Sequence, residues 1–145
     1  MTNEASRSVH ITLQGKGGVG KSFISSLIYQ YLRSKGEPVI GIDTDPVNAT
    51  FSGYDSFQAE HLSLMNGGEL DIGKFDGMME HIVEDASNFV VDNGASSFVP
   101  LSFYLAENDA FSILLENGKK PVIHTVLMGG QSLNDTMAGF TSLVT

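Results

Sequence analysis

Apolar residues in this chain form short continuous runs and spaced stripes, separated by glycine, proline and polar turns. Short runs of β-branched and apolar residues predict buried strands, whereas apolar positions at i, i+3, i+4 and i+7 predict amphipathic helices. The runs predict strands at 9–13, 39–42, 89–91 and 121–127, and an edge strand at 61–65. The stripes predict helices at 22–35, 74–84, 98–106, 109–117 and 132–144.

Two of the predicted helices have a clear apolar stripe, which should face the core. In the helix at 22–35 the stripe consists of Ile24, Leu27, Ile28 and Tyr31. In the helix at 74–84 it consists of Phe75, Met78, Met79 and Ile82. Gly36 should end the first helix, because glycine is the commonest residue just past a helix C-terminus and Pro38 follows.

The alternation of strands and helices predicts an α/β fold with a mostly parallel sheet and helices on both faces. We expect a disordered lead at residues 1–7, followed by one domain at 8–145. The last predicted helix runs to Thr145 without a stop signal. This favours a C-terminally truncated chain that holds the N-terminal portion of a larger fold.

Composition excludes several classes of function. Eight Lys and Arg residues against 17 Asp and Glu give a formal net charge of −9, which disfavours direct contact with nucleic acid. The absence of cysteine excludes disulfides and thiolate metal sites. No apolar run approaches the ~18 residues of a transmembrane helix, and the polar N-terminus does not resemble a signal peptide. We therefore expect a cytoplasmic protein.

The stretch from Gly15 to Ser22 matches the phosphate-loop pattern G-x-x-x-x-G-K-[ST] between a predicted strand and a predicted helix. Its members are Gly15, Lys16, Gly17, Gly18, Val19, Gly20, Lys21 and Ser22. Glycines let backbone N–H groups surround an anion, and the following helix adds its positive N-terminal end. Lys21 would contact the β and γ phosphates and Ser22 would ligate Mg²⁺. The pattern therefore predicts binding of ATP with Mg²⁺.

Two other interpretations concern the glycine-rich loop and the acidic segment that follows the second predicted strand. The pattern G-x-G-x-x-G also fits an NAD-binding loop, with Asp43 placed about 20 residues on to hold a ribose. Lys21 and Ser22 favour a triphosphate, because an NAD loop has no need of them. The pattern Asp43-x-Asp45-x-Val47 also fits the start of a haloacid dehalogenase phosphatase, but Lys119-Lys120 lacks the acid pair which that class needs downstream.

Acidic residues follow two predicted strands at the edge where open parallel sheets bind ligands. The run from Phe89 to Asp92 has the form of a Walker B element, whose acid faces Mg²⁺ or its water ligands. Asp43 and Asp45 follow the second strand. In a P-loop ATPase these two acids would reach the γ phosphate and the attacking water.

Residues 16–22, with the extra lysine at Lys16, resemble the deviant Walker A motif of the ParA/MinD/nitrogenase-iron-protein ATPases. Residues 43–50 resemble the D-x-D-P-x-x-N-A-T segment of the same family. Three longer stretches, 13–22, 42–51 and 91–101, resemble a family of conjugal transfer proteins of broad-host-range plasmids. That likeness extends to 123–126 and 129–131, so it covers most of the chain.

The resemblance implies roles for individual residues. Lys16 would reach across an ATP-bridged homodimer, Asp45 would activate or position the attacking water, and Asp92 would hold Mg²⁺ through water. The dimer would then report its nucleotide state to conjugation or partition proteins. The segment Asp92-Asn93-Gly94-Ala95 departs from the family pattern. A regulatory module that binds nucleotide with negligible turnover therefore stays open.

The histidines and the paired serines carry no prediction of catalysis. His10 and His124 lie inside predicted strands, where packed or edge histidines are common, and the four histidines have no metal-ligand spacing. Ser96 and Ser97 lack the G-x-S-x-G context of a nucleophile, so we expect a helix cap there.

Overall fold

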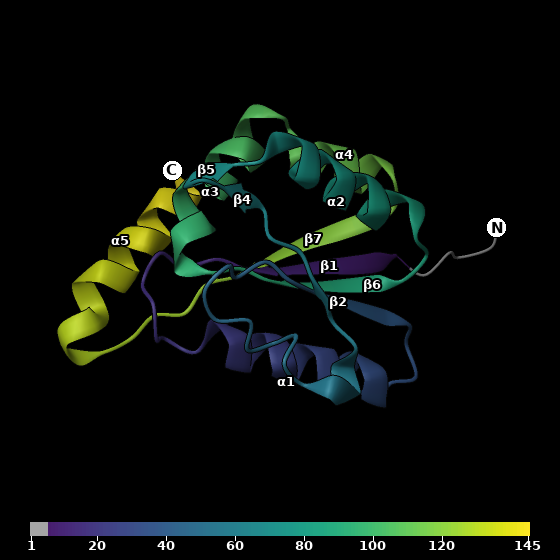
Figure 1. Cartoon of the computed structure of the whole chain (residues 1–145), viewed down its shortest axis with the longest axis horizontal. Coiled ribbons are helices and arrows are strands. Elements are labelled where there is room, and N and C mark those ends of the chain that lie inside the picture. The colour runs from purple at the N-terminus through teal and green to yellow at the C-terminus, as the bar shows by residue number, and fades with distance from the viewer. Residues whose placement is uncertain (1–5) are drawn as a thin grey trace.

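The computed structural model describes residues 6–145 and has a five-stranded sheet in the order β3-β2-β6-β1-β7. Every neighbouring pair in this sheet is parallel. Helix α1 covers one face, and helices α2, α3 and α4 cover the other (Figure 1). The predicted α/β fold with a parallel sheet and helices on both faces is confirmed.

The strands of the sheet lie close to their predicted positions. They are β1 (Arg7–Thr12), β2 (Val39–Asp43), β3 (Glu60–His61), β6 (Asn88–Asp92) and β7 (Lys119–His124). Two boundaries were wrong: the edge strand β3 is very short, and β7 ends before the predicted residue 127. Residues 1–5, most of the predicted lead, lie outside the described residues, whereas Arg7 already pairs with Lys119.

A small antiparallel hairpin replaces most of the predicted edge strand at 61–65. Its strands are β4 (Met65–Asn66) and β5 (Glu69–Leu70). Gly67 and Gly68 form the turn between them, with φ angles of 58° and 87°. Glycine adopts such left-handed backbone conformations at little cost, so the turn forms where the sequence predicts one.

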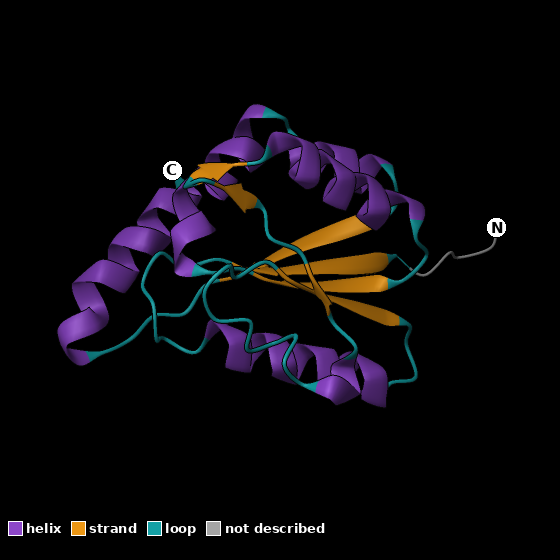
Figure 2. Ribbon diagram, viewed as in Figure 1, coloured by secondary structure: helices purple, strands orange, loops and turns teal. Residues whose placement is uncertain are grey.

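The helices start and end within about two residues of the predicted boundaries (Figure 2). They are α1 (Lys21–Ser34), α2 (Ile72–Glu84), α3 (Phe98–Glu107), α4 (Ala110–Glu116) and α5 (Leu133–Val144). Short 3₁₀ turns lie at Asp55–Phe57, Ala95–Ser97 and Gly130–Ser132. Among residues 6–145, no helix is both long enough and apolar enough to cross a membrane.

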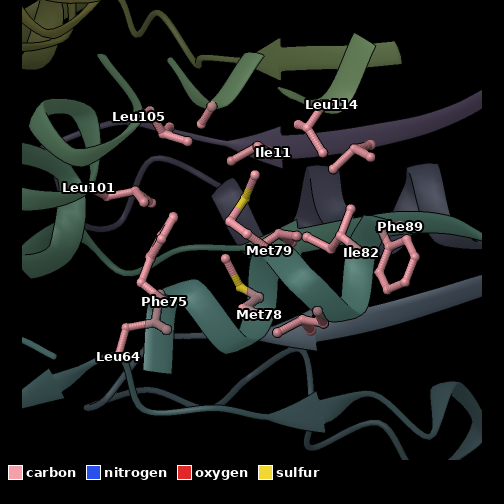
Figure 3. Packing of buried hydrophobic residues seen from close by; sticks show 14 of the residues in the cluster. Ile11, Leu64, Phe75, Met78, Met79, Ile82, Phe89, Leu101, Leu105 and Leu114 are labelled. Carbon is pink, nitrogen blue, oxygen red and sulfur yellow. The ribbon is translucent and has the colours of Figure 1, made fainter. Parts of the chain in front are cut away.

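The main core lies between the sheet and helices α2, α3 and α4 (Figure 3). The predicted stripe of α2 is confirmed, because Phe75, Met78, Met79 and Ile82 are all buried. These side chains pack with Ile11 of β1 and with residues of β6, α3 and α4. Burying a large apolar side chain stabilises a fold by roughly 1.5–3 kcal/mol, so this layer fixes the orientation of the sheet.

Helix α1 corrects one prediction. Its buried face carries Ser25, Ser26, Tyr29 and Leu32, whereas Leu27 is 47% and Tyr31 is 61% exposed. The small serines let the helix lie close to the sheet. There the Ser25 hydroxyl contacts the hydroxyl of Thr12 and donates to the carboxylate of Asp92. Hydrogen-bonded serines thus form part of the buried face, where the apolar pattern predicted only apolar side chains.

His10 and His124 are paired directly on the α1 side of the sheet. His10 Nδ1 lies 2.8 Å from His124 Nε2, and its Nε2 lies 2.9 Å from Ser8 Oγ. Burial, followed by the charge of His124, lowers the pKa of His10 to about 4, against a weaker raising effect of Glu37. Burial also lowers the pKa of His124. Both rings are therefore neutral at neutral pH.

This pair predicts acid sensitivity of the fold. Because folding lowers the pKa of His10 from 6.5 to about 4, the folded chain binds fewer protons, and stability should fall as pH drops through this window. Solvent reaches the ring and screens its charge. We therefore expect the unfolding free energy to fall by about 1–2 kcal/mol, less than the full pKa shift would give. Urea unfolding at pH 7 and pH 4.5 measures it.

The variant that tests this is His10→Gln. It should flatten the dependence of the unfolding free energy on pH relative to the parent chain. If the unfolding free energy depends on pH equally in the parent and in His10→Gln, the acid sensitivity does not come from His10.

Candidate nucleotide-binding site

The loop between β1 and α1 lies at the carboxyl edge of the sheet, as the sequence predicted. Gly18 and Gly20 have φ angles of 70° and 98°, in the left-handed region that favours glycine. Gly20 is also the N-cap residue of α1, so the loop passes directly into the positive end of the helix. The backbone of the loop therefore has the form of an anion site.

A cavity of about 540 Å³ opens next to this loop. Three segments from the carboxyl edge line it: the phosphate loop with the start of α1, residues 45–50 after β2, and residues 93–96 after β6. Phe23 and Val47 contribute an apolar rim, with exposed fractions of 66% and 78%. The cavity is of a size that suits a small-molecule ligand.

Lys21 lies within the loop and is 8% exposed. Its Nζ donates a hydrogen bond to the carbonyl oxygen of Lys16 at 2.8 Å. Burial lowers the pKa of Lys21, while the charges of Asp92 and Asp45 raise it. The ammonium group thus lies at the cavity beside two carboxylates and next to the glycine amides.

Ser22 lines the cavity, and the buried Asp92 lies directly behind it. Ser22 Oγ donates to Asp92 Oδ2 at 2.6 Å, and Ser25 and Thr12 donate to Oδ1 at 3.0 and 3.1 Å. Burial raises the pKa of Asp92, the three hydroxyls lower it, and Asp43 raises it further. The predicted Walker B acid is thus held against the predicted magnesium ligand by three elements of the fold.

The oxygen donors of Ser22 and Asp92 fit Mg²⁺, which prefers oxygen ligands. Within residues 6–145 no cluster of three or more His, Asp or Glu side chains could hold a metal ion by itself. Mg²⁺ commonly binds through one or two protein groups and shares the oxygens of substrate phosphates. The donor set therefore suits an ion that arrives with a nucleotide.

Asp45 and Asp43 have different surroundings. Asp45 lines the cavity, and its Oδ1 accepts hydrogen bonds from the amides of Val47 and Asn48 at 2.9 and 3.0 Å. Asp43 is fully buried, with Oδ1 accepting from Asp45 N at 3.0 Å and Oδ2 from Ser52 N at 2.8 Å. Asp43 therefore holds the loop that carries Asp45. Asp43 itself does not line the cavity.

Comparison with known proteins then decides the family. Residues 11–126 match the CobQ/CobB/MinD/ParA nucleotide-binding domain, which is most of the chain. The chain belongs to this family.

Relatives of known sequence agree with the assignment to the MinD/ParA family. Two proteins named TraL, both from Escherichia coli, are 51% and 48% identical to this chain over 135 residues. That region is 93% of this chain and 56% of each TraL protein, so the chain spans little more than half their length. An uncharacterized ATP-binding protein of Methanocaldococcus jannaschii is 50% identical over 36 residues, 25% of this chain and 14% of that protein. No solved structure matches the chain significantly.

Two residues of this MinD/ParA domain join the cavity segments but were not among the predicted site residues. Asn93 accepts from Thr44 Oγ1 at 2.7 Å and donates to Thr12 O at 3.1 Å, which links the ends of three strands. At Gly94, a Cβ atom would lie 2.9 Å from Asp45 Cγ. Glycine thus allows the segments after β2 and β6 to touch. The only sequence signal was the departure at residues 92–95 from the family pattern.

Lys16, the extra lysine of the MinD/ParA loop, does not line the cavity. Its Nζ lies 3.0 Å from Asp135 Oδ2 of α5, and the two side chains are 42% and 60% exposed. Such an exposed ion pair adds little stability. The structure thus directs the side chain of Lys16 towards α5, while its carbonyl oxygen stays bonded to Lys21.

Proposed function

We propose that the chain binds ATP with Mg²⁺ in the cavity beside the phosphate loop and hydrolyses it as a nucleotide-dependent switch. The observation that carries this proposal is the hydrogen bond of 2.6 Å between Ser22 Oγ and Asp92 Oδ2. It places a Walker A hydroxyl and a Walker B carboxylate side by side, next to glycine amides and Lys21. An NAD site has no use for this pair of groups.

Each group has a distinct task in this proposal. The amides of residues 17–20 and the N-terminus of α1 bind phosphate oxygens, and Lys21 neutralises charge on the β and γ phosphates. Ser22 and Asp92 would hold Mg²⁺. When bound, the ion would supply positive charge next to the phosphates.

Asp45 is our candidate for orienting the attacking water. Its Oδ1 is used by the amides of its own loop, whereas Oδ2 has no hydrogen-bond partner within residues 6–145. The two amide hydrogen bonds hold the carboxylate at the cavity, and Gly94 leaves room for it there. A fixed acceptor at this place suits general-base or water-positioning chemistry.

Lys16 would act outside its own cavity, in an ATP-bridged homodimer. Its side chain is directed away from the cavity and is 42% exposed, which leaves it accessible to a second subunit. By its resemblance to conjugal transfer proteins, we propose that the dimer acts with conjugation proteins, with plasmid partition as the alternative.

A thermal-shift series tests the ligand, and phosphate release tests turnover. ATP with Mg²⁺ should raise the melting temperature by a few degrees at saturating concentration, because a ligand that binds only the folded state stabilises it. NAD should give no shift. Stabilisation by NAD and not by ATP would overturn the proposal. Binding of ATP with no phosphate release, alone or with conjugation partners, would instead establish a regulatory binding module.

A further inference from the structure

Helix α5 reaches the phosphate loop from a distant part of the chain. Figure 1 shows α5 beyond the carboxyl ends of the strands, beside the loop that follows β1. Asp135, Thr136 and Gly139 of α5 form the contact, with Lys16 and Gln14 as their partners. Positions i, i+1 and i+4 lie on one side of a helix, so a single face of α5 meets the loop.

Gln14 is the centre of this contact and is 1% exposed. Its Nε2 lies 3.1 Å from Val126 O, 3.1 Å from Thr136 O and 3.3 Å from Thr125 Oγ1. Its Oε1 accepts from the amide of Lys16 at 3.4 Å. The buried side chain therefore connects the phosphate loop to the β7–α5 connection and to α5 itself.

Gly139 leaves the space that Gln14 needs. A Cβ atom at this position would lie 2.2 Å from Gln14 Oε1 and 3.0 Å from its Cδ. Glycine inside a helix costs about 1 kcal/mol relative to alanine, and here its backbone is not left-handed. The close approach of the glutamine amide is thus the physical reason for glycine at this position.

The peptide groups of Lys16 connect this contact to the cavity. The amide of Lys16 donates to Gln14 Oε1, and its carbonyl oxygen accepts from Lys21 Nζ at 2.8 Å. One residue of the loop is therefore fixed by Gln14 on one side and by the phosphate-binding lysine on the other. A displacement of α5 would therefore act on Gln14 and, through Lys16, on the loop.

We propose that Gln14 is a positioning residue that couples the docking of α5 to the shape of the phosphate loop, and so to the affinity for ATP. The ATP part of this inference rests on the proposed function. Coupling between two sites is reciprocal, so ATP binding also changes how firmly α5 docks. A protein that binds α5 would then alter nucleotide affinity without entering the cavity.

A double-mutant cycle on the 145-residue chain tests the coupling. Gly139→Ala should move the ¹⁵N–¹H resonance of the Lys16 amide in the absence of nucleotide and weaken ATP binding about tenfold. In the Gln14→Ala background the added methyl group has room, so Gly139→Ala should add little further change. Gly77→Ala in α2 is the matched control, because a Cβ atom there meets nothing within 4 Å.

The outcomes separate this inference from the proposed function. Additive effects of the two substitutions, or an unmoved Lys16 resonance in Gly139→Ala, would overturn the coupling. A moved resonance with non-additive effects in a chain that does not bind ATP would leave the coupling intact and refute the proposed ligand. If Gly139→Ala does not fold, Gln14→Asn supplies the same readout. Its shorter side chain no longer reaches the Lys16 amide, and an unmoved resonance would again reject the inference.

Discussion

Replacing Lys21 with alanine should weaken ATP binding at least ~100-fold while the chain stays folded. Lys21 is a buried cation that lines the cavity, and without it the phosphates would lose this positive charge while the Asp45 carboxylate still lines the same cavity. A loss of this size corresponds to about 2.7 kcal/mol, which is reasonable for a charged hydrogen-bonded partner at a partly buried site.

Stability gives an independent check on the Lys21→Ala variant. Burial lowers the pKa of Lys21, which means that the folded chain holds the charged lysine at a cost in free energy. The melting temperature without ligand should therefore stay the same or rise, while the shift produced by ATP is lost. Lys35→Ala, at an exposed position past α1, is the control and should bind ATP normally. Normal ATP affinity in Lys21→Ala would show that the site is misassigned.

Replacing Asp45 with alanine should leave ATP binding within a few fold of the parent but lower the hydrolysis rate by about 10²-fold or more. The side chain lines the cavity without being part of the phosphate loop. Loss of its carboxylate therefore removes a group that acts on the water rather than one that binds the triphosphate. Single-turnover phosphate release separates the chemical step from binding.

Asp45→Asn distinguishes chemistry from loop structure. Asp45 Oδ1 also accepts the amides of Val47 and Asn48, and alanine would remove that cap together with the charge. Asparagine keeps an acceptor oxygen at the cap but lacks the carboxylate. We expect Asp45→Asn to remain as slow as Asp45→Ala. Parental turnover in the asparagine variant would limit Asp45 to a structural role.

The fold and the phosphate loop could be predicted because their signals are local. A β-branched run at 9–13, glycines at 15–20 and the stripe from Phe75 to Ile82 each specify an element within a few residues. The buried face of α1 could not be predicted in the same way. Ser25 is buried because Asp92 and Thr12, far away in sequence, hydrogen-bond with its hydroxyl, and no apolar pattern encodes that.

The residues that organise the site depend on contacts between distant segments. The buried position of Asp43 follows from its strand's register beside Asp92, and its two amide partners lie on the following loop. Gln14 and Gly139 meet across 125 positions of sequence only after β7 has placed α5 beside the loop. The position and backbone form of the phosphate loop were therefore predictable, whereas the contacts that orient it required the structure.

The buried carboxylate of Asp43 ties together both ends of the segment that carries Asp45. One oxygen binds the amide of Asp45 and the other binds the amide of Ser52. Residues 46–51 thus form a loop. Both ends of this loop are anchored to one carboxylate at the end of β2, a central strand of the sheet. Loss of the Asp43 carboxylate would therefore release both ends at once.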